Sequence, residues 1–253
     1  MIYIRSALFN ILFYLNMIIL MIIGLPTMLF GRRAILALAK TWAASSLWLL
    51  KIICGISVEF RGTQHIPSGG LIIAAKHQSV WETFALLLHF DDFTFILKRE
   101  LTWIPFFGWY TIRAEQIAID RSSGRSALSQ VTSRSRDITA AGRQVFIFPE
   151  GTRRPPGAEP LYKFGVAHVY ASSNVPCLPV ALNSGLYWPR RTFLRRPGVV
   201  LVEFLDPIAP GMGRDEFFAV LQDRLESATN KLIAEAVEAD PSLRDVIPTA
   251  AGE

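Results

Sequence analysis

The chain has 253 residues, of which 51% are hydrophobic and 19% are charged, and its formal net charge is +5. It is more apolar than an ordinary soluble domain and less apolar than a transporter with many membrane spans, so we expect a globular body with one apolar appendage. The basic balance is typical of partners such as nucleic acid or an anionic membrane. Because the sequence has no RNA-recognition, zinc-finger or basic-zipper pattern, we expect a membrane and no nucleic acid.

The two cysteines, Cys54 and Cys177, are far apart and lie in apolar surroundings. One pair of cysteines builds neither a disulfide framework nor a metal site. We therefore expect two buried free thiols, as suits a reducing cytoplasm, and no bound metal.

The N-terminal part of the chain is predicted to form a membrane hairpin. Residues 6–30 contain no charged side chain, and as a helix they extend roughly 37 Å, enough for a hydrocarbon core of about 30 Å. A second apolar stretch, residues 34–53, follows a turn at Gly31, and Pro26 is expected to kink the first helix. We assign residues 1–55 to this membrane-docking or transmembrane unit.

The depth of this hairpin in the bilayer is open between two arrangements, one that spans the membrane twice and one that lies in a single leaflet. Both return the chain to the side from which it entered. The basic residues of the body favour the cytoplasmic face of the inner membrane. A secretory signal peptide is the rival interpretation, but it would have a shorter apolar core and a cleavage site of small residues.

The rest of the chain, residues 56–253, is predicted to form one α/β domain. Strands are predicted at residues 58–61, 71–75, 93–97, 116–119, 144–148, 177–182 and 199–204. Helices are predicted at residues 79–90, 126–141, 164–173 and 215–239. This alternation indicates a largely parallel central sheet flanked by helices, with active groups just beyond the carboxyl ends of the strands.

A candidate base follows the second predicted strand. His77 comes directly after this buried run, and Glu82 lies five positions further on. A neutral imidazole takes a proton from an alcohol at neutral pH, and it does so better when a carboxylate fixes its tautomer. In one continuous helix this spacing would separate the two side chains by roughly 140° around the axis. They meet only if His77 lies in the loop before the helix and Glu82 in its first turn.

The same sequence gives Glu82 an alternative role. Ser79-Val80-Trp81-Glu82 matches a capping box, in which Ser79 caps the helix and Glu82 reaches back to the Ser79 amide. Such a box places His77 two residues before the cap, so it supports the geometry while competing for the same carboxylate. We favour the catalytic pairing of His77 with Glu82.

A candidate phosphate site follows the fifth predicted strand. Glycine lets the backbone approach a ligand, arginine binds a phosphate through two hydrogen bonds, and threonine adds a donor. The residues expected to bind the phosphate and the acceptor are Lys98, Arg99, Glu150, Gly151, Thr152 and Arg153. Glu150 is an anion beside an anion site, so we expect it to hold Arg153 in place or to accept a hydrogen bond from a substrate hydroxyl. For Arg99, exposure to water is an equal alternative.

Residues 188–196 combine two aromatic residues with four arginines. This segment would suit a lipid headgroup region or an acidic acyl-carrier protein. A solvated basic loop is the simpler interpretation, and we favour it.

Four sequence blocks together resemble the PlsC-like glycerolipid acyltransferase family. That family carries a His-x4-Asp block, a block with Lys or Arg, a Phe-Pro-Glu-Gly-Thr-Arg block and a Val-Pro-x-x-Pro block. Similar blocks stand here in the same order at residues 77–82, 97–101, 148–153 and 175–179. The third block is the most specific, and the N-terminal hairpin is also similar to the family's membrane-docking helices. One position departs from the pattern, because Glu82 replaces the usual aspartate.

The resemblance implies an enzyme that moves a fatty acyl group from acyl-CoA or acyl-carrier protein to the sn-2 hydroxyl of lysophosphatidic acid. It implies no bound cofactor. By the same resemblance His77 is the general base, Glu82 orients it, and Lys98, Thr152 and Arg153 contact the phosphate.

Three alternatives stand beside this function. A lyso-lipid without phosphate, such as lyso-ornithine lipid, would pair its carboxylate with Arg153. A hydrolase would need a nucleophile, and the sequence has no Gly-x-Ser-x-Gly elbow. A membrane scaffold without activity would not need the base and the phosphate block.

Overall fold

The computed structural model describes residues 1–248, except for the side chain of Arg121. Its centre is a seven-stranded sheet in the order β1-β7-β6-β2-β5-β3-β4. The strands are β1 Ile56–Arg61, β2 Leu71–Ala75, β3 Phe93–Lys98, β4 Ile117–Ile119, β5 Gln144–Ile147, β6 Cys177–Leu182 and β7 Gly198–Phe204. All neighbouring pairs are parallel except β6 and β7. The predicted α/β class with a largely parallel sheet is confirmed.

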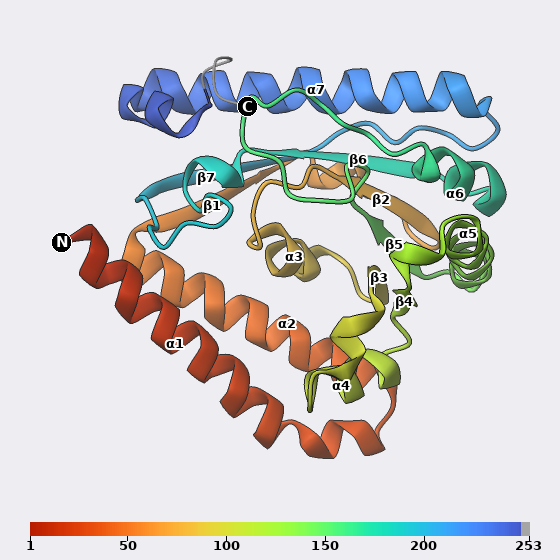
Figure 1. Cartoon of the computed structure of the whole chain (residues 1–253), viewed down its shortest axis with the longest axis horizontal. Coiled ribbons are helices and arrows are strands. Elements are labelled where there is room, and N and C mark those ends of the chain that lie inside the picture. Colours follow the sequence, from red (N-terminus) through yellow and green to blue (C-terminus); the bar gives the residue numbers. More distant parts are fainter. Residues whose placement is uncertain (249–253) are drawn as a thin grey trace.

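Helices cover both faces of the sheet, with α1 and α2 on one side and α7 on the other (Figure 1). Their bounds are α1 Ile2–Ile23, α2 Arg32–Leu49, α3 Glu82–Ala85, α4 Phe107–Arg113, α5 Arg125–Ala140, α6 Gly165–Ser173 and α7 Arg214–Ala239. The sequence did not predict α4. The other helices fall where helical segments were expected, although α3 is much shorter than its prediction.

The central strand β2 is buried on both faces, which explains its continuous apolar sequence. Leu71, Ile73 and Ala75 point into a core shared with the hairpin, whereas Ile72 and Ala74 point into a core shared with α6 and α7. The carboxyl end of this strand therefore emerges from the centre of the molecule, between two packed layers. The packing of this strand holds the residues that follow it in a fixed position.

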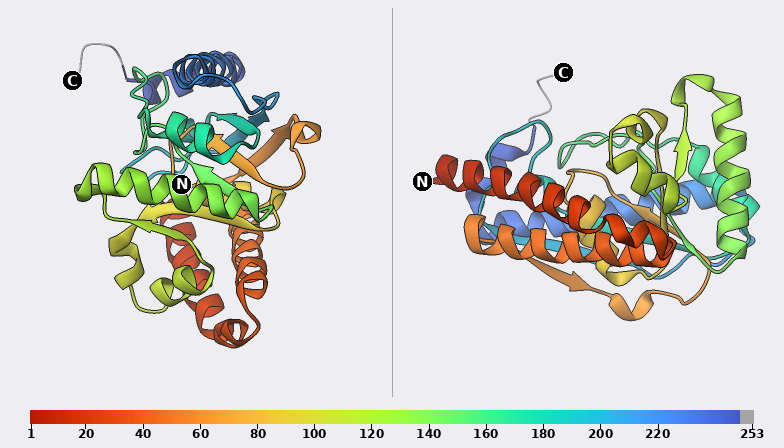
Figure 2. Two further views of the ribbon diagram at one scale, coloured as in Figure 1. Left: turned by 90° about the vertical axis from the view of Figure 1, so that its right-hand side faces the viewer. Right: turned by 90° about the horizontal axis from the view of Figure 1, so that it is seen from below.

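The two N-terminal helices form the predicted hairpin and run side by side (Figure 2, right). Each is long and apolar enough to cross a membrane. The kink expected near Pro26 is a complete break: α1 ends at Ile23, a short 3-10 turn spans Leu25–Leu29, and Gly31 adopts a φ of +83° before α2 begins. Proline at the start of the turn and glycine at its end account for the break.

The hairpin packs directly on the body of the protein. Phe13 of α1 contacts Phe84 and Trp188, with ring centroids 5.6 Å apart in both cases. At the other end of the hairpin, Arg32 at the start of α2 donates two hydrogen bonds to Asp92, just before β3. Residues 1–55 thus share one apolar core with the sheet and make polar contacts with the body, among them Arg32 with Asp92 and Lys40 with Asp91.

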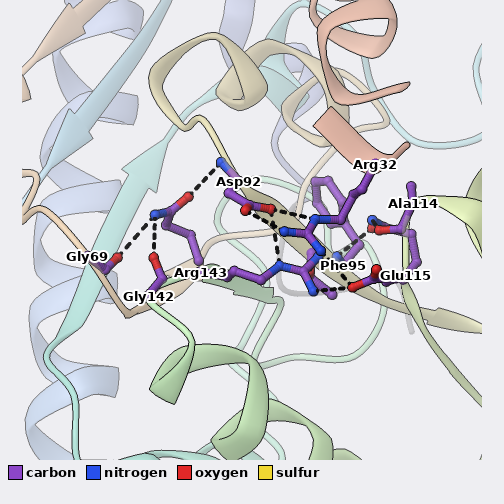
Figure 3. Close-up of polar contacts among 11 residues, drawn as sticks. Arg32, Gly69, Asp92, Phe95, Ala114, Glu115, Gly142 and Arg143 are labelled. Atoms are coloured by element: carbon purple, nitrogen blue, oxygen red, sulfur yellow. Dashed lines mark hydrogen bonds and ion pairs between the residues drawn. The ribbon is translucent and has the colours of Figure 1, made fainter. Parts of the chain in front are cut away.

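The contact of Arg32 with Asp92 belongs to a small network of two arginines and two carboxylates (Figure 3). Arg143, at the start of β5, also donates to Asp92, and both arginines donate to Glu115. Burial alone would raise the pKa of Asp92, but the hydrogen bonds and charges of Arg32 and Arg143 outweigh it and lower that pKa below its ordinary value of 3.8. The network connects the tip of the hairpin to the amino-terminal edge of the sheet.

Candidate active site

His77 and Glu82 meet directly beyond the carboxyl end of β2. The distance from His77 Nδ1 to Glu82 Oε1 is 2.8 Å, and the Glu82 side chain is completely buried. Since an ionised carboxylate only accepts, Nδ1 carries the proton and Nε2 carries the free lone pair. Within residues 1–248, Nε2 has no hydrogen-bond partner, and the ring keeps 15% of its surface exposed. This is the geometry of a general base fixed in one tautomer.

Three further hydrogen bonds fix the Glu82 carboxylate. Its Oε1 accepts from the backbone amides of Gln78 and Ser79, at 2.8 and 2.7 Å. Its Oε2 accepts from the Ser184 hydroxyl at 2.7 Å. The capping interaction and the pairing with histidine, weighed above as competitors, are therefore made by the same oxygen at the same time.

The predicted helix over residues 79–90 is wrong in its start and its length. The structure has a loop up to Trp81, then α3 for one turn from Glu82, and then a 3-10 helix, Leu86–His89. Ser79 lies in the loop, where its hydroxyl accepts from the Trp81 amide at 3.2 Å. Glu82 holds the backbone of this loop in place, so the helix starts at Glu82 and not at Ser79.

The loop after β5 lies against His77, as the sequence predicted for the two blocks. The His77 ring stacks on Phe148 with centroids 4.1 Å apart. The Arg154 amide donates to the His77 carbonyl at 2.8 Å. Two segments more than 70 positions apart in the sequence thus form one wall of the site, because β2 and β5 are neighbours in the sheet.

Glu150 does not hold Arg153, as one of its two expected roles required. Its carboxylate is buried, and Oε1 accepts from Lys76 Nζ at 3.0 Å. Lys76 also contacts Glu226 of α7, which in turn accepts from the Tyr162 hydroxyl. Burial raises the pKa of Glu150, and the positive charge of Lys76 offsets this only in part. The physical reason for the correction is that a buried lysine, and not an arginine at the surface, is the nearest cation.

The remaining residues of the predicted phosphate site lie beyond the carboxyl ends of two neighbouring strands, β5 and β3. Gly151 has a φ of +66°, a conformation that favours glycine, and it is followed by the exposed Thr152 and the half-buried Arg153. Arg153 forms no ion pair within residues 1–248. Lys98 is exposed at the end of β3, the strand beside β5.

Arg99, like Glu150, has a structural partner of its own. Its guanidinium pairs with Asp120 at 2.8 Å and lies over the Trp103 ring. The side chain remains half exposed. This contact links the ends of β3 and β4, so Arg99 has a structural role whether or not it also meets a substrate.

Sequence reasoning missed Lys76, Tyr162, Ser184 and Glu226. A lysine directly before His77, at the end of an apolar run, was the one available signal, because a buried lysine needs an anionic partner. Ser184 and Glu226 approach the site only through the folded arrangement of β6 and α7, and Tyr162 comes from the loop between β5 and α6.

Fold and site together define an α/β protein with a base–carboxylate pair and a basic loop at the carboxyl edge of its sheet. A sequence model of the Acyltransferase family matches residues 57–183. The chain is 36% identical over 200 residues to the 1-acyl-sn-glycerol-3-phosphate acyltransferase of Pseudomonas aeruginosa, covering 78% of this chain and 76% of that protein. The chain belongs to the acyltransferase family.

Two further similarities agree with this assignment. The chain is 29% identical over 163 residues to mouse 1-acyl-sn-glycerol-3-phosphate acyltransferase alpha, covering 63% of this chain and 57% of that protein. The crystal structure of the LPA acyltransferase PlsC from Thermotoga maritima superposes with a TM-score of 0.74 at 22% identity. It covers 92% of this chain and 99% of the Thermotoga chain, and it shows the same fold.

Proposed function

We propose that this protein transfers a fatty acyl group from acyl-CoA or acyl-carrier protein to the sn-2 hydroxyl of lysophosphatidic acid, giving phosphatidic acid. The observation that carries the proposal is the contact of His77 Nδ1 with the buried Glu82 carboxylate, beside the loop that contains Thr152 and Arg153. The names of the relatives described above support the same acceptor.

In the proposed reaction the phosphate of the acceptor binds Arg153, Thr152 and Lys98, while Glu150 and Gly151 shape the acceptor site. Binding at a fixed point places the free hydroxyl near His77 Nε2, an advantage of positioning. Nε2 takes the hydroxyl proton as the oxygen attacks the thioester carbonyl, and the C–S bond then breaks. The leaving thiolate receives a proton from the imidazolium, so the base is restored and no acyl-enzyme forms.

The ionised carboxylate of Glu82 stabilises the imidazolium while it exists. Its three other hydrogen bonds keep it in place during the cycle. The added methylene, relative to the family's aspartate, is matched by contacts to two amides and to Ser184.

We also propose that the apolar hairpin holds the protein on the cytoplasmic face of the membrane. The outer side of α1 exposes many large apolar side chains, among them Ile4, Ile11, Ile18, Ile22 and Ile23. A surface of this kind is covered by lipid more readily than by water. The acceptor, itself a lipid, would then enter the site from the bilayer.

An acceptor panel tests the proposed function. Purified protein in lipid nanodiscs would be given radiolabelled acyl-CoA or acyl-carrier protein with lysophosphatidic acid, lyso-ornithine lipid or no acceptor. We expect labelled phosphatidic acid with the first acceptor, little product with the second and little free fatty acid with none. Preferred acylation of lyso-ornithine lipid would reassign the acceptor, and rapid release of free acid would indicate a hydrolase.

A further inference from the structure

A cluster of arginines lies next to the candidate site and forms no ion pair with the carboxylates of residues 1–248. Arg153 and Arg154 come from the loop after β5, and Arg190, Arg191 and Arg196 come from the loop after β6. Arg190 donates to the carbonyl of Arg153 at 2.7 Å, which joins the two loops. Partial burial and the charges of the three nearest arginines together lower the pKa of Arg190.

Several other arginines also form no ion pair with a described residue, so what sets this group apart is that its unpaired members gather on two adjoining loops. Five arginines elsewhere in the described part of the chain each form an ion pair with a carboxylate, namely Arg32, Arg61, Arg99, Arg136 and Arg143. Within residues 1–248, no member of the cluster does so. Nε of Arg154 is buried and has no hydrogen-bond partner there. So much unpaired like charge is costly unless an anion neutralises it.

The cluster borders a cavity of about 330 Å³. Its wall is formed by apolar residues with two arginines and a threonine among them, including Pro156, Pro189, Arg190, Leu194, Arg196 and Val246. Asp245 also lines this cavity but forms no ion pair with the described arginines. An apolar hollow with a cationic rim suits a small molecule that combines phosphates with an aromatic ring, better than the flat surface of a bilayer or a protein.

The loop that carries Arg190, Arg191 and Arg196 also contacts the candidate catalytic pair. It begins with Ser184, which donates to Glu82, and the Gly185 amide donates to the Gln78 side chain at 3.0 Å. A ligand held by the later part of this loop is therefore attached to the same scaffold as the base.

The sheet order separates the loop after β6, which carries both arginines of the cavity wall, from Lys98 on the proposed acceptor side, while Pro155 and Pro156 of the loop after β5 complete the wall. In the order β6-β2-β5-β3, His77 follows β2, the cavity loop follows β6 on one side, and Lys98 ends β3 on the other. A reaction with two phosphorylated substrates needs two anion sites with the base between them. The acceptor phosphate is assigned to the loop after β5 and to Lys98, which leaves the loop after β6 for the other substrate.

We propose that this cavity binds the phosphorylated nucleotide end of a coenzyme A thioester, with Arg190, Arg191 and Arg196 contacting its phosphates. The inference rests on the proposed acyl transfer and names the donor for it. The pantetheine arm then reaches from the cavity to His77, where the thioester meets the acceptor hydroxyl. Arg153, between the two sites, is left to the acceptor.

Calorimetric titration of the full chain in nanodiscs with free coenzyme A tests binding without any need for turnover. We expect Arg191→Gln and Arg196→Gln each to weaken binding about tenfold, the loss of one hydrogen bond to a charged group. Neither side chain makes a hydrogen bond to the described residues, so both variants should fold normally. For wild type, 3′-dephospho-coenzyme A should bind more weakly than coenzyme A. The matched control is Arg134→Gln, an exposed arginine on α5.

Steady-state kinetics then show which of the two substrates these arginines bind. We expect both variants to raise KM for acyl-CoA about tenfold, with kcat and the KM for lysophosphatidic acid unchanged. A rise confined to the KM for the lyso-lipid would move the cluster to the acceptor and overturn the proposal. So would a loss confined to acyl-carrier protein as donor, or a loss of vesicle binding with both KM values intact. If wild type binds coenzyme A but transfers no acyl group, the proposed function fails and this cavity assignment stands.

Discussion

Glu82 is held by more hydrogen bonds than a pairing with histidine requires. In Glu82→Gln an amide replaces a carboxylate that accepts from two backbone amides, a hydroxyl and Nδ1. The variant no longer stabilises an imidazolium, so we expect kcat to fall about 10²- to 10⁴-fold with little change in KM. Steady-state kinetics with lysophosphatidic acid would measure this.

A shorter carboxylate at the same position is the informative comparison. Glu82→Asp keeps the charge but cannot reach both His77 and Ser184, so we expect intermediate activity. Full activity in Glu82→Gln, with the protein folded, would contradict the role of this carboxylate.

Lys76 is buried among two carboxylates and a tyrosine, and its removal should be costly. In Lys76→Met the carboxylates of Glu150 and Glu226 lose their shared cation, and we expect a loss of about 3 to 5 kcal/mol in the free energy of unfolding. Denaturant titration in detergent would measure it. Lys231→Met, on the exposed face of α7, is the control and should change little.

A second substitution tests whether the loss comes from unpaired charge. Lys76→Met combined with Glu226→Gln leaves one buried carboxylate fewer without a partner. The double variant should therefore be more stable than the sum of the two single effects. Simple additivity would show that Lys76 acts through packing alone.

The sequence predicted the contact between His77 and Glu82 better than the residues that hold this pair. His77 and Glu82 were predictable because their spacing and their place after a strand are local features. Ser184 and Glu226 were not, because they approach Glu82 and Lys76 only after β6 and α7 have packed. One of the two roles expected for Glu150, holding Arg153, was wrong, because the burial of its carboxylate beside Lys76 depends on the folded structure and does not follow from the sequence of one loop.

At the scale of elements, the network of Arg32, Asp92 and Arg143 connects the hairpin to the sheet. Asp92→Asn removes its central charge and leaves Arg143 buried with a single carboxylate partner, so we expect a loss of about 2 kcal/mol. Thermal unfolding of the purified protein would measure it. The matched control is Asp91→Asn, because Asp91 is fully exposed and its surface ion pair with Lys40 should contribute little.

The same network predicts a pH dependence. Because the pKa of Asp92 is lowered by folding, its contribution to stability is complete above the ordinary value of 3.8 and is lost as the pH falls towards the lowered value. The stability difference between wild type and Asp92→Asn should therefore shrink below about pH 4. A difference that stays constant down to pH 2 would show that Asp92 acts through its shape alone.

Helices and strands were predicted correctly where the pattern of buried residues determines them. They were predicted wrongly where contacts between side chains and a loop, or between distant segments, determine them. The continuous apolar run of β2 was sufficient, because burial on both faces is visible in the sequence. The helix over residues 79–90 was overestimated, since the Glu82 carboxylate fixes a loop where helix was expected. The order of the strands and the antiparallel pairing of β7 with β6 depend on long-range packing, which one sequence does not show.

At the scale of the whole molecule, the hairpin is part of the core as well as the proposed membrane anchor. Phe9 and Phe13 are almost completely buried against Phe84 and Trp188. Removing residues 1–55 would expose these aromatic rings, so we expect residues 56–253 alone to aggregate or to unfold without cooperativity. Size-exclusion chromatography and circular dichroism would show this, and a soluble, cooperatively folding fragment would contradict it.

The most direct test concerns the imidazole itself, measured as the kcat for acyl transfer to lysophosphatidic acid by purified His77→Gln in nanodiscs. The account predicts a fall of about 10²- to 10⁴-fold, with the thermal unfolding temperature and the affinity for the acceptor unchanged. Turnover within a few-fold of wild type would contradict it, because no other base lies between the two proposed anion sites in the part of the chain that the structure describes.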